Sequence, residues 1–537
     1  MSDSTFAPLK YPAYRALLGA SLVANLGVLV QGVGAGWLMT SLTDDAGMVA
    51  LVQGSQTLPL AVLSLLGGVL ADSFERRSVM LLAQIFMLAM AALLAGLAAL
   101  QIITPWSLLA FTFAISCGTA IRLPSWQASV GDLVPREHLP QAVMLNGMGF
   151  NLMRSVGPAV GGVIVALWGA GAAFTITAVG FAPMLYTLAN WRPASLPDPL
   201  PREPLGASLR VGLRYASLST EHLKIMMRGA IFGFGAVSFL ALLPLVARDM
   251  LQGTASTYGL ILGFFGVGAV GAAMSLRRLR ERFDTETIVR IAFLCLAVAL
   301  PLTGLSRSVW LTGVAGMIAG FAWQCSMALF NIAVQLSTPR WVLGRIISVL
   351  QVFTFTGMSL GSWLWGEVAT RFAVPEALFG AAAVCLLGGL LGLVVRLPEE
   401  GRDNLEPHNG AAPPVPALDI DMRSGPIKVQ VEYIVPDEKT EAFLELMARR
   451  RVIRQRDGAL GWSLYRDLAE PERWHESYRA ATWAGYLRHL ARRTTTDAEN
   501  YKLLVALLGG DPRAKARRWI ERPPDPRQLH ARRDETP

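Results

Sequence analysis

Polar side chains that could bind a ligand or carry a proton stand inside long apolar runs of this sequence. Arg122 and Arg154 are flanked by apolar residues, and Glu367 is an acidic residue inside a late run. Because charge in hydrocarbon is costly, such groups usually face a cavity or pair with one another. Glu367 is the candidate proton carrier, although it stands near the end of its run. The candidate substrate-pathway residues, which could also be structural helix-to-helix contacts, are Asn25, Gln31, Arg122, Asn146, Asn151, Arg154, Gln324 and Asn331.

The composition of the chain indicates that one part is surrounded by lipid and the other by water. Of 537 residues, 53% are hydrophobic and 16% are charged, whereas an average soluble domain has about 25% charge. About one residue in ten is charged up to Arg396, and about one in three after it. The net charge of +9 belongs mostly to the apolar part, which argues against nucleic-acid binding. We therefore expect a membrane domain in a lipid bilayer, followed by a water-exposed tail.

Twelve stretches are long and apolar enough to span a membrane, which takes about 20 residues each. They predict two six-helix bundles, an all-α membrane fold. The four cysteines lie inside apolar runs, have no zinc-type spacing and predict neither a metal nor a cofactor. The expected spans are 16–41, 48–71, 78–102, 106–131, 138–168, 171–191, 224–247, 256–276, 287–306, 309–336, 343–369 and 374–396.

The loop charges set the expected orientation, because Lys and Arg resist translocation. Most cations of the apolar part fall on one side if the N-terminus is inside, and both termini are then cytoplasmic. We expect a multi-pass protein of the plasma (inner) membrane. The expected divisions are a first bundle (1–192), a proline-rich cytoplasmic linker (193–223), a second bundle (224–396), a flexible linker (397–425), a folded tail (426–522) and a disordered end (523–537).

An internal repeat supports the division into two bundles. Gly157 and Gly162 recur as Gly361 and Gly366, both displaced by 204 positions, and Pro135-Arg136 recurs at the same displacement. Gly68 and Arg77 recur as Gly271 and Arg280 at a displacement of 203. A near-constant offset is expected for two related halves, whose binding cleft lies between them near mid-membrane.

A charged loop follows the second span. Gly68 permits close helix packing, Asp72 places a carboxylate at the membrane edge, and the arginines after it suit a helix C-terminus. Positive-inside anchoring explains the arginines but not Asp72. The segment resembles the signature loop of the major facilitator superfamily, with Ser73 and Glu75 as departures. The resemblance implies a charge network that latches the halves. Its gating residues would be Gly68, Asp72, Arg76 and Arg77.

The fifth span carries a second motif. Mid-helix proline removes a hydrogen bond and bends the axis, while glycine allows tight packing, so a generic kink is one explanation. The segment also resembles the Gly-Pro-x-x-Gly-Gly core found in antiporter-type exporters of that superfamily, although Met153 replaces an upstream glycine. The resemblance favours export. The motif residues are Gly157, Pro158, Gly161 and Gly162.

A closer resemblance covers roughly residues 8–400. Val134-Pro135-Arg136, Asn146, Asn151, Arg154 and Gly157-Pro158 resemble the enterobactin-exporter-like branch of the superfamily, the transmembrane secretion effectors. The resemblance implies proton-coupled efflux of a siderophore, another secondary metabolite or a drug. It does not name the substrate.

The tail predicts a βαββαβ order, which is a ferredoxin-like α+β fold. Segments around Trp462, Tyr465 and Trp483 resemble antibiotic-biosynthesis-monooxygenase-like domains, which form dimers, so the tail could dimerise the protein. The expected strands are 427–435, 461–468, 473–480 and 514–522, and the expected helices are 437–455, 483–493 and 497–508.

Catalytic chemistry is not evident in the tail. His475, Glu476 and His489 have no metal spacing and no nucleophile–base arrangement. The aromatic residues are expected to fill a core or a dimer interface, and Arg449-Arg450-Arg451 to form a solvated helix face. We expect no enzyme. The alternatives are a bifunctional exporter whose tail modifies or senses the substrate, and a receptor or scaffold without transport.

Overall fold

The structure is a computed structural model that describes residues 6–192, 205–339, 341–398, 416–418, 420–510 and 516–521. It separates into two compact units. The first, here the helical unit, comprises Met1–Ser195, Thr220–Leu336 and Gly344–Glu400. The second, here the tail unit, comprises Leu196–Ser219, Ser337–Leu343 and Gly401–Pro537.

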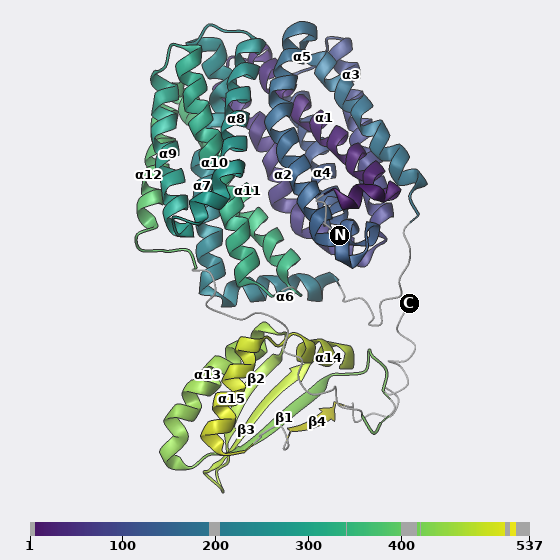
Figure 1. The fold of residues 1–537 in the computed structure, drawn as a ribbon, viewed down its shortest axis with the longest axis vertical. Coiled ribbons are helices and arrows are strands. Elements are labelled where there is room, and N and C mark those ends of the chain that lie inside the picture. The colour runs from purple at the N-terminus through teal and green to yellow at the C-terminus, as the bar shows by residue number, and fades with distance from the viewer. Residues whose placement is uncertain are drawn as a thin grey trace. The chain divides into compact units, whose positions relative to one another are not determined.

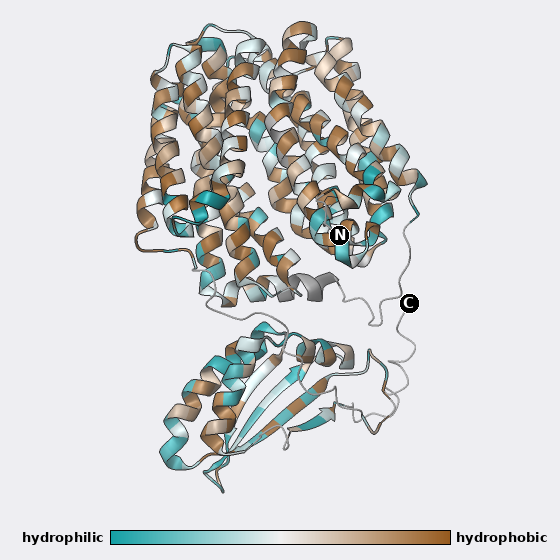
Figure 2. Cartoon of the chain, viewed as in Figure 1, coloured by the Kyte–Doolittle hydropathy of each residue, from teal (hydrophilic) through white to brown (hydrophobic). Residues whose placement is uncertain are grey.

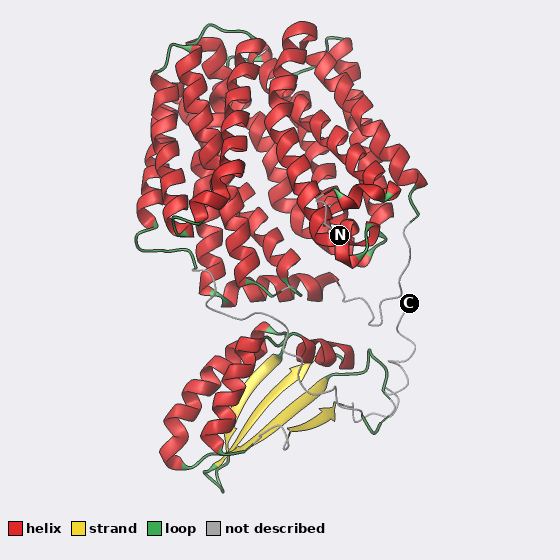
Figure 3. Cartoon of the chain, viewed as in Figure 1, coloured by secondary structure: helices red, strands yellow, loops and turns green. Residues whose placement is uncertain are grey.

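The helical unit is built from long apolar helices (Figures 1 and 3). Among the described residues, eleven helices are long and apolar enough to span a membrane. Their ribbons in Figure 2 are coloured largely brown and white, with little of the teal that marks hydrophilic residues. The first half contains α1 (Pro12–Leu42), α2 (Ala46–Ser73), α3 (Arg76–Ala99), α4 (Pro105–Leu133) and α5 (Leu139–Asn190), with short turns η1 (Ala7–Lys10) and η2 (Arg136–His138). The second half contains α7 (Thr220–Leu245), the π-turn η3 (Val246–Met250), α8 (Ala255–Arg280), α9 (Thr285–Leu305), α10 (Val309–Ser337), α11 (Leu343–Arg371) and α12 (Val374–Leu391).

Helix α5 holds two consecutive spans. Gly169 has a φ of +78°, a conformation that glycine adopts without strain and that breaks the helix there. Before it, Gly161 packs against Val30 of α1, and after it Thr177 Oγ1 donates to the Gly27 carbonyl of the same helix, 2.8 Å away. Two segments of α5 therefore pack on α1. Dividing α5 at Gly169 gives the twelve spans that the sequence predicts, which confirms the predicted fold class.

The tail unit contains a four-stranded antiparallel sheet with helices (Figure 1). The strand order is β2-β3-β1-β4, and the order along the chain is βαββαβ if α14 and α15 count as one helical layer. This confirms the predicted ferredoxin-like fold. The elements are α6 (Leu205–Leu218), β1 (Ile427–Ile434), η4 (Asp437–Lys439), α13 (Thr440–Arg456), β2 (Leu460–Arg466), β3 (Arg473–Ala480), α14 (Trp483–Ala491), α15 (Thr495–Leu508) and β4 (Ala516–Ile520).

Alternation along the strands builds the tail core. Alternate residues of β1 are buried, from Ile427 to Tyr433, and they meet Trp474 and Tyr478 of the neighbouring β3. Trp483 of α14 closes the same core, as expected for these aromatic side chains. The helices therefore cover one face of the sheet.

A buried carboxylate ties α13 to this sheet. Glu476 of β3 is fully buried and accepts hydrogen bonds from Arg450 Nε and Arg454 Nε, each at 3.0 Å, and from Tyr433 Oη at 2.6 Å. Burial raises the pKa of Glu476, but the two guanidinium charges and the Tyr433 bond outweigh it, so the pKa lies well below its usual range. Arg450 is 7% exposed. The prediction that Arg449-Arg450-Arg451 forms a solvated face is therefore wrong for Arg450, because a carboxylate beneath the helix neutralises it.

Replacing Glu476 with glutamine is expected to destabilise the tail by about 3–5 kcal/mol, because two buried arginines lose their counter-charge. Hydrogen exchange of the β3 amides in the full-length protein measures the loss. Glu438→Gln, at an exposed position of η4, is the matched control. Because the pKa of Glu476 is lower in the folded than in the unfolded protein, its ionised carboxylate stabilises the fold above a pH of about 4.3, the unfolded pKa. This contribution is lost as the pH falls from that value through the lower pKa of the folded protein. Equal exchange rates for both variants would contradict the assigned role.

Candidate functional site: a polar pathway and a gate

Arg122 is a buried guanidinium in the first half of the helical unit. It lies on α4, is 1% exposed, and its Nη2 donates to Asn25 Oδ1 of α1 at 3.0 Å. Its Nε and Nη1 atoms are buried without a hydrogen-bond partner. A buried charge ordinarily has an opposite charge beside it, and unused guanidinium donors fit planar anionic groups. Arg122 is thus a buried charge with unused hydrogen-bond donors, and its place in the substrate pathway stays a prediction.

Other amides of the predicted pathway bind neighbouring helices. Gln31 Nε2 of α1 donates to Thr112 Oγ1 of α4 at 3.1 Å, and Asn146 Oδ1 of α5 accepts from Trp126 Nε1 of α4 at 3.0 Å. With Asn25, these residues connect α1, α4 and α5 through polar contacts. Among the described residues, the structure thus brings Asn25, Gln31, Arg122 and Asn146 into one bundle. Gln31 and Asn146 have the helix-to-helix bonds that were the alternative to a cavity-facing role.

The second-half candidates lie apart from this group in the described contacts. Asn331 Nδ2 of α10 donates to the Met327 carbonyl of its own helix at 2.8 Å, and Gln324, about two turns before Asn331, is half-buried. Glu367 Oε1 on α11 accepts from Arg371 Nε at 2.6 Å, and its side chain is 39% exposed. Its role as proton carrier stays a prediction. The side chains of Asp72, Asn151 and Arg154 lie outside the described residues.

The arginines of the charged loop bind within the first half. Arg76 Nη1 pairs with Asp132 Oδ2 at 2.7 Å and donates to the Ala128 carbonyl at 3.0 Å, both on α4. Arg77 donates to the Leu188 and Ala189 carbonyls at the C-terminal end of α5, where a cation suits the helix dipole. In this conformer, these two arginines hold α3 to α4 and α5. The latch between halves stays a prediction.

Glycines bring the two halves into backbone contact. A Cβ atom added to Gly162 of α5 would lie 2.2 Å from the Gly259 Cα of α8, so the two helices touch there without side chains. At the repeat-related position, a Cβ on Gly366 of α11 would lie 2.7 Å from Ala50 Cβ and 3.1 Å from Gly47 Cα, both on α2. Gly162 and Gly366 therefore serve equivalent contacts across the halves.

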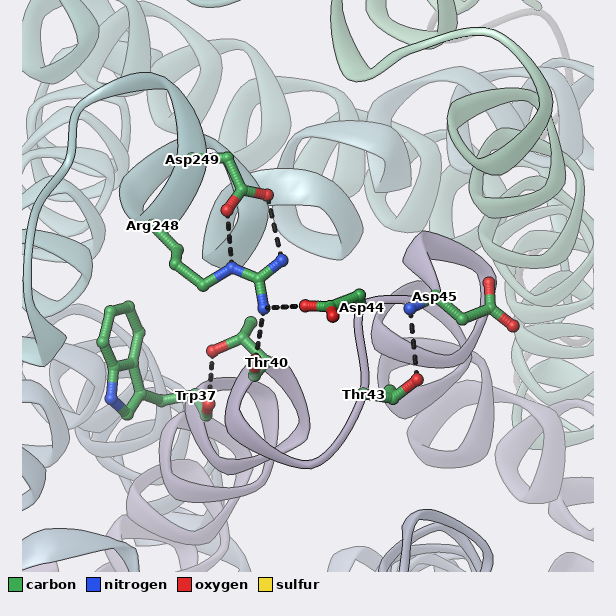
Figure 4. Close-up of polar contacts among 7 residues, drawn as sticks. All are labelled: Trp37, Thr40, Thr43, Asp44, Asp45, Arg248 and Asp249. Atoms are coloured by element: carbon green, nitrogen blue, oxygen red, sulfur yellow. Dashed lines mark hydrogen bonds and ion pairs between the residues drawn. The ribbon is translucent and has the colours of Figure 1, made fainter.

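Polar contacts across the halves gather at the end that carries the α1–α2 loop, here the Asp44 end (Figure 4). Arg248 of η3 binds the Thr40 carbonyl of α1 and approaches Asp44 Oδ1 at 3.4 Å, while Asp249 holds its guanidinium from the other side at 2.6 Å. Thr370 Oγ1 of α11 donates to Asp45 Oδ1 at 2.9 Å. The halves are joined at this end.

Deeper contacts continue the same seam. Thr57 Oγ1 of α2 lies 2.9 Å from Ser359 Oγ of α11, and Ser362 Oγ donates to the Ala50 carbonyl. Trp37 of α1 stacks on Tyr258 of α8, with ring centroids 6.2 Å apart. The structure is therefore a conformer closed at the Asp44 end.

Sequence reasoning missed a buried ion pair in the second half. Arg228 Nη1 of α7 lies 3.1 Å from Glu286 Oε1 of α9, and their side chains are 0% and 8% exposed. Glu286 Oε2 also accepts from the Leu397 backbone N–H at 3.0 Å. The signal available in the sequence was one Arg and one Glu near the ends of two spans that face the same side of the membrane. Such a pair could have been predicted to bind. Both resemble ordinary span-end charges.

Two related six-helix halves, joined at one end and carrying a polar interior, define a secondary transporter of the major facilitator type. The chain belongs to the transmembrane secretion effector family, whose model matches residues 3–524. It is a multi-pass membrane protein, and the match includes the tail.

Curated relatives agree with this class, and solved structures share the fold. The chain is 28% identical over 400 residues to the enterobactin exporter EntS of Escherichia coli O1:K1, covering 72% of this chain and 92% of the relative. It is 29% identical over the same length to EntS of Shigella boydii serotype 18. A bacterial homologue of the lysosomal transporter Spinster, inward-facing and unoccupied, has a similar fold (TM-score 0.57, 14% identity, 74% of this chain and 96% of that chain). So does the POT family transporter PepTSo (TM-score 0.59, 13% identity, 72% and 97%).

Proposed function

We propose that this protein exports a small acidic molecule, such as a siderophore or another secondary metabolite, in exchange for protons. The two halves alternately expose a central pathway to either side of the membrane, with both chain termini in the cytoplasm. Similarity to enterobactin exporters supports the direction and the substrate class. The uneven distribution of loop cations supports the orientation.

The observation that carries the alternating-access mechanism is the glycine contact between halves. Gly162 against Gly259, and Gly366 against Gly47, allow the backbones of two rigid bundles to touch at the Asp44 end. These two contacts can separate as a unit, because no side chain interlocks at either of them. The opposite conformer would open this end and release the substrate there.

Arg122 supports the acidic class of substrate. Its Nε and Nη1 atoms are buried and have no hydrogen-bond partner, while Nη2 donates to Asn25 Oδ1 and fixes the position of the guanidinium. An anionic group that reached Arg122 would supply the missing acceptors, and a charge-assisted hydrogen bond contributes about 1.5–3 kcal/mol. A neutral substrate would leave the guanidinium uncompensated.

Inside-out vesicles test the proposal, with enterobactin as the probe. Vesicles with an acidic lumen should accumulate the probe and lose protons in step. Arg122→Gln should lower the initial rate about tenfold or more, because a charged acceptor loses its partner. Arg122→Lys, which keeps the charge but loses the fork, should retain part of the activity.

Matched controls separate coupling from binding. Arg277→Gln removes an arginine whose side chain is 90% exposed and should transport normally. Asp72→Asn should reduce proton release and probe uptake together if the predicted gating motif acts in the cycle. Probe uptake at the same rate with and without a proton gradient would refute proton coupling. Full transport activity of Arg122→Gln would refute the proposed anion site at Arg122.

A further inference from the structure

Two aromatic residues from outside the folded tail lie against arginines of its helices, all within the tail unit. The Arg456 guanidinium, at the end of α13, stands 5.6 Å from the ring of Tyr215 on α6. The Arg492 guanidinium, just after α14, stands 4.3 Å from the ring of Trp341, in the turn between α10 and α11. Tyr215 and Trp341 meet each other edge-on at 5.8 Å. The four side chains, here the aromatic–arginine junction, join three distant segments.

Neighbouring groups of the tail hold both arginines in these positions. Arg456 Nη2 pairs with Asp497 Oδ2 of α15 at 2.5 Å, and its Nε pairs with Asp457 Oδ1 at 3.2 Å. Arg492 Nη1 donates to the Asp457 carbonyl at 3.1 Å. Because the arginines are fixed before they meet the rings, little side-chain entropy is lost in the contact. Tyr215 is 3% exposed, so its ring is enclosed by the contact.

The junction contacts two segments that lead directly into helices of the second half. Tyr215 lies five residues before α7, on the only described segment between the end of the first half and the start of the second. Trp341 lies two residues before α11. Near its start, α11 approaches the other half, since a Cβ on Gly68 of α2 would lie 3.7 Å from Ser348 Oγ. A change at Trp341 is therefore transmitted to the helix that borders the opposite half.

We propose that the aromatic–arginine junction is an autoinhibitory contact: the folded tail holds α6 and the turn before α11 in the arrangement of the conformer closed at the Asp44 end. In this proposal the contact is made in the conformer closed at the Asp44 end and lost in the opposite one, so it favours the closed conformer. A change that separates the tail from Tyr215 and Trp341 shifts the population toward the conformer open at the Asp44 end and increases turnover. This regulation rests on the alternating-access function proposed above.

The test uses the full-length protein with its four cysteines replaced and a single reporter, Val49→Cys. Val49 is 1% exposed at the start of α2, near the Asp44 end. Tyr215→Ala combined with Trp341→Ala should speed labelling of the reporter by a membrane-impermeant maleimide about fivefold or more, as expected for a typical coupling free energy. Probe uptake in vesicles should rise in parallel. Both substitutions lie outside the folded tail, so they leave its core intact.

Two controls accompany the double variant. Trp341→Phe keeps an aromatic ring over Arg492 and should label close to the parent rate. Leu213→Ala removes a side chain that is 43% exposed on α6 and should have no effect. Hydrogen exchange should rise around Arg456 and Arg492 in the double variant alone.

The outcomes separate this proposal from the transport proposal. Faster labelling without probe transport would keep the contact and refute the assigned substrate. Unchanged or slower labelling, with exchange showing the tail released, would refute autoinhibition. Unchanged exchange around Arg456 and Arg492 would show that the rings do not hold the tail, which also refutes it.

Discussion

Replacing Arg228 with methionine is expected to cost about 3–5 kcal/mol of stability, because it leaves the Glu286 carboxylate buried without its counter-charge. Arg228 Nη1 binds both Glu286 and the Val395 carbonyl, at 3.1 and 3.0 Å, and its guanidinium stacks 5.2 Å from the Phe293 ring. The single side chain thus joins α7, α9 and the segment after α12. We expect the variant to express poorly and to unfold well below the parent temperature.

A thiol-reactive dye measures this loss in detergent. Cys325 and Cys385 are 1% and 0% exposed, so they react only when the second half unfolds. Arg371→Met is the matched control, because the Arg371–Glu367 pair is exposed and exposed pairs contribute at most about 1 kcal/mol.

The double variant Arg228→Met, Glu286→Leu distinguishes charge from shape. Removing both members leaves no orphaned charge, so most of the stability should return. If the double variant is as unstable as the single one, packing around Gly392 rather than the ion pair is responsible. A Cβ on Gly392 would lie only 2.7 Å from Arg228 Nη1, so the space there is tight.

The fold was predictable because it depends on local patterns. Apolar length predicts the spans, and alternation along Ile427–Ile434 predicts a strand with one buried face. The break at Gly169, between the fifth and sixth spans, follows from the same counting. Each of these signals lies within a few turns of chain and needs no partner to be recognised.

The site was predictable only in part, because its geometry depends on residues far apart in sequence. Arg122 is conspicuous as a charge inside an apolar run, and the structure finds it buried with Asn25. Arg248, in contrast, resembles a loop cation until the fold places it beside Thr40 of the other half. Arg450 of α13 was assigned to solvent because its partner, Glu476, lies on strand β3, 26 residues further along the chain.

Substituting alanine at Gly162 is expected to prevent the Asp44 end from closing. The new Cβ would lie 2.2 Å from the Gly259 Cα, and neither backbone can yield as a flexible side chain would. Overpacking of this kind costs about 1–3 kcal/mol, which lowers the ratio of closed to open conformers by about 5- to 150-fold. Labelling of the Val49→Cys reporter from the Asp44 side should become faster. Vesicle transport should fall at least tenfold, because the clash obstructs the closing step that every cycle requires, whereas Tyr215→Ala with Trp341→Ala leaves this contact between the halves intact.

Because of the internal repeat, the prediction for Gly162 can be checked at a second, equivalent contact. Gly366→Ala meets Ala50 at the equivalent contact of the other pair of helices, so it should also speed labelling and slow transport. Gly147→Ala, on the same helix as Gly162 but with no atom within 4 Å of the added Cβ, should leave both measurements unchanged. If Gly147→Ala is as harmful as Gly162→Ala, helix flexibility controls the cycle. If Gly162→Ala and Gly366→Ala act in opposite directions, the two contacts do not close together, and movement of the halves as rigid bodies is refuted.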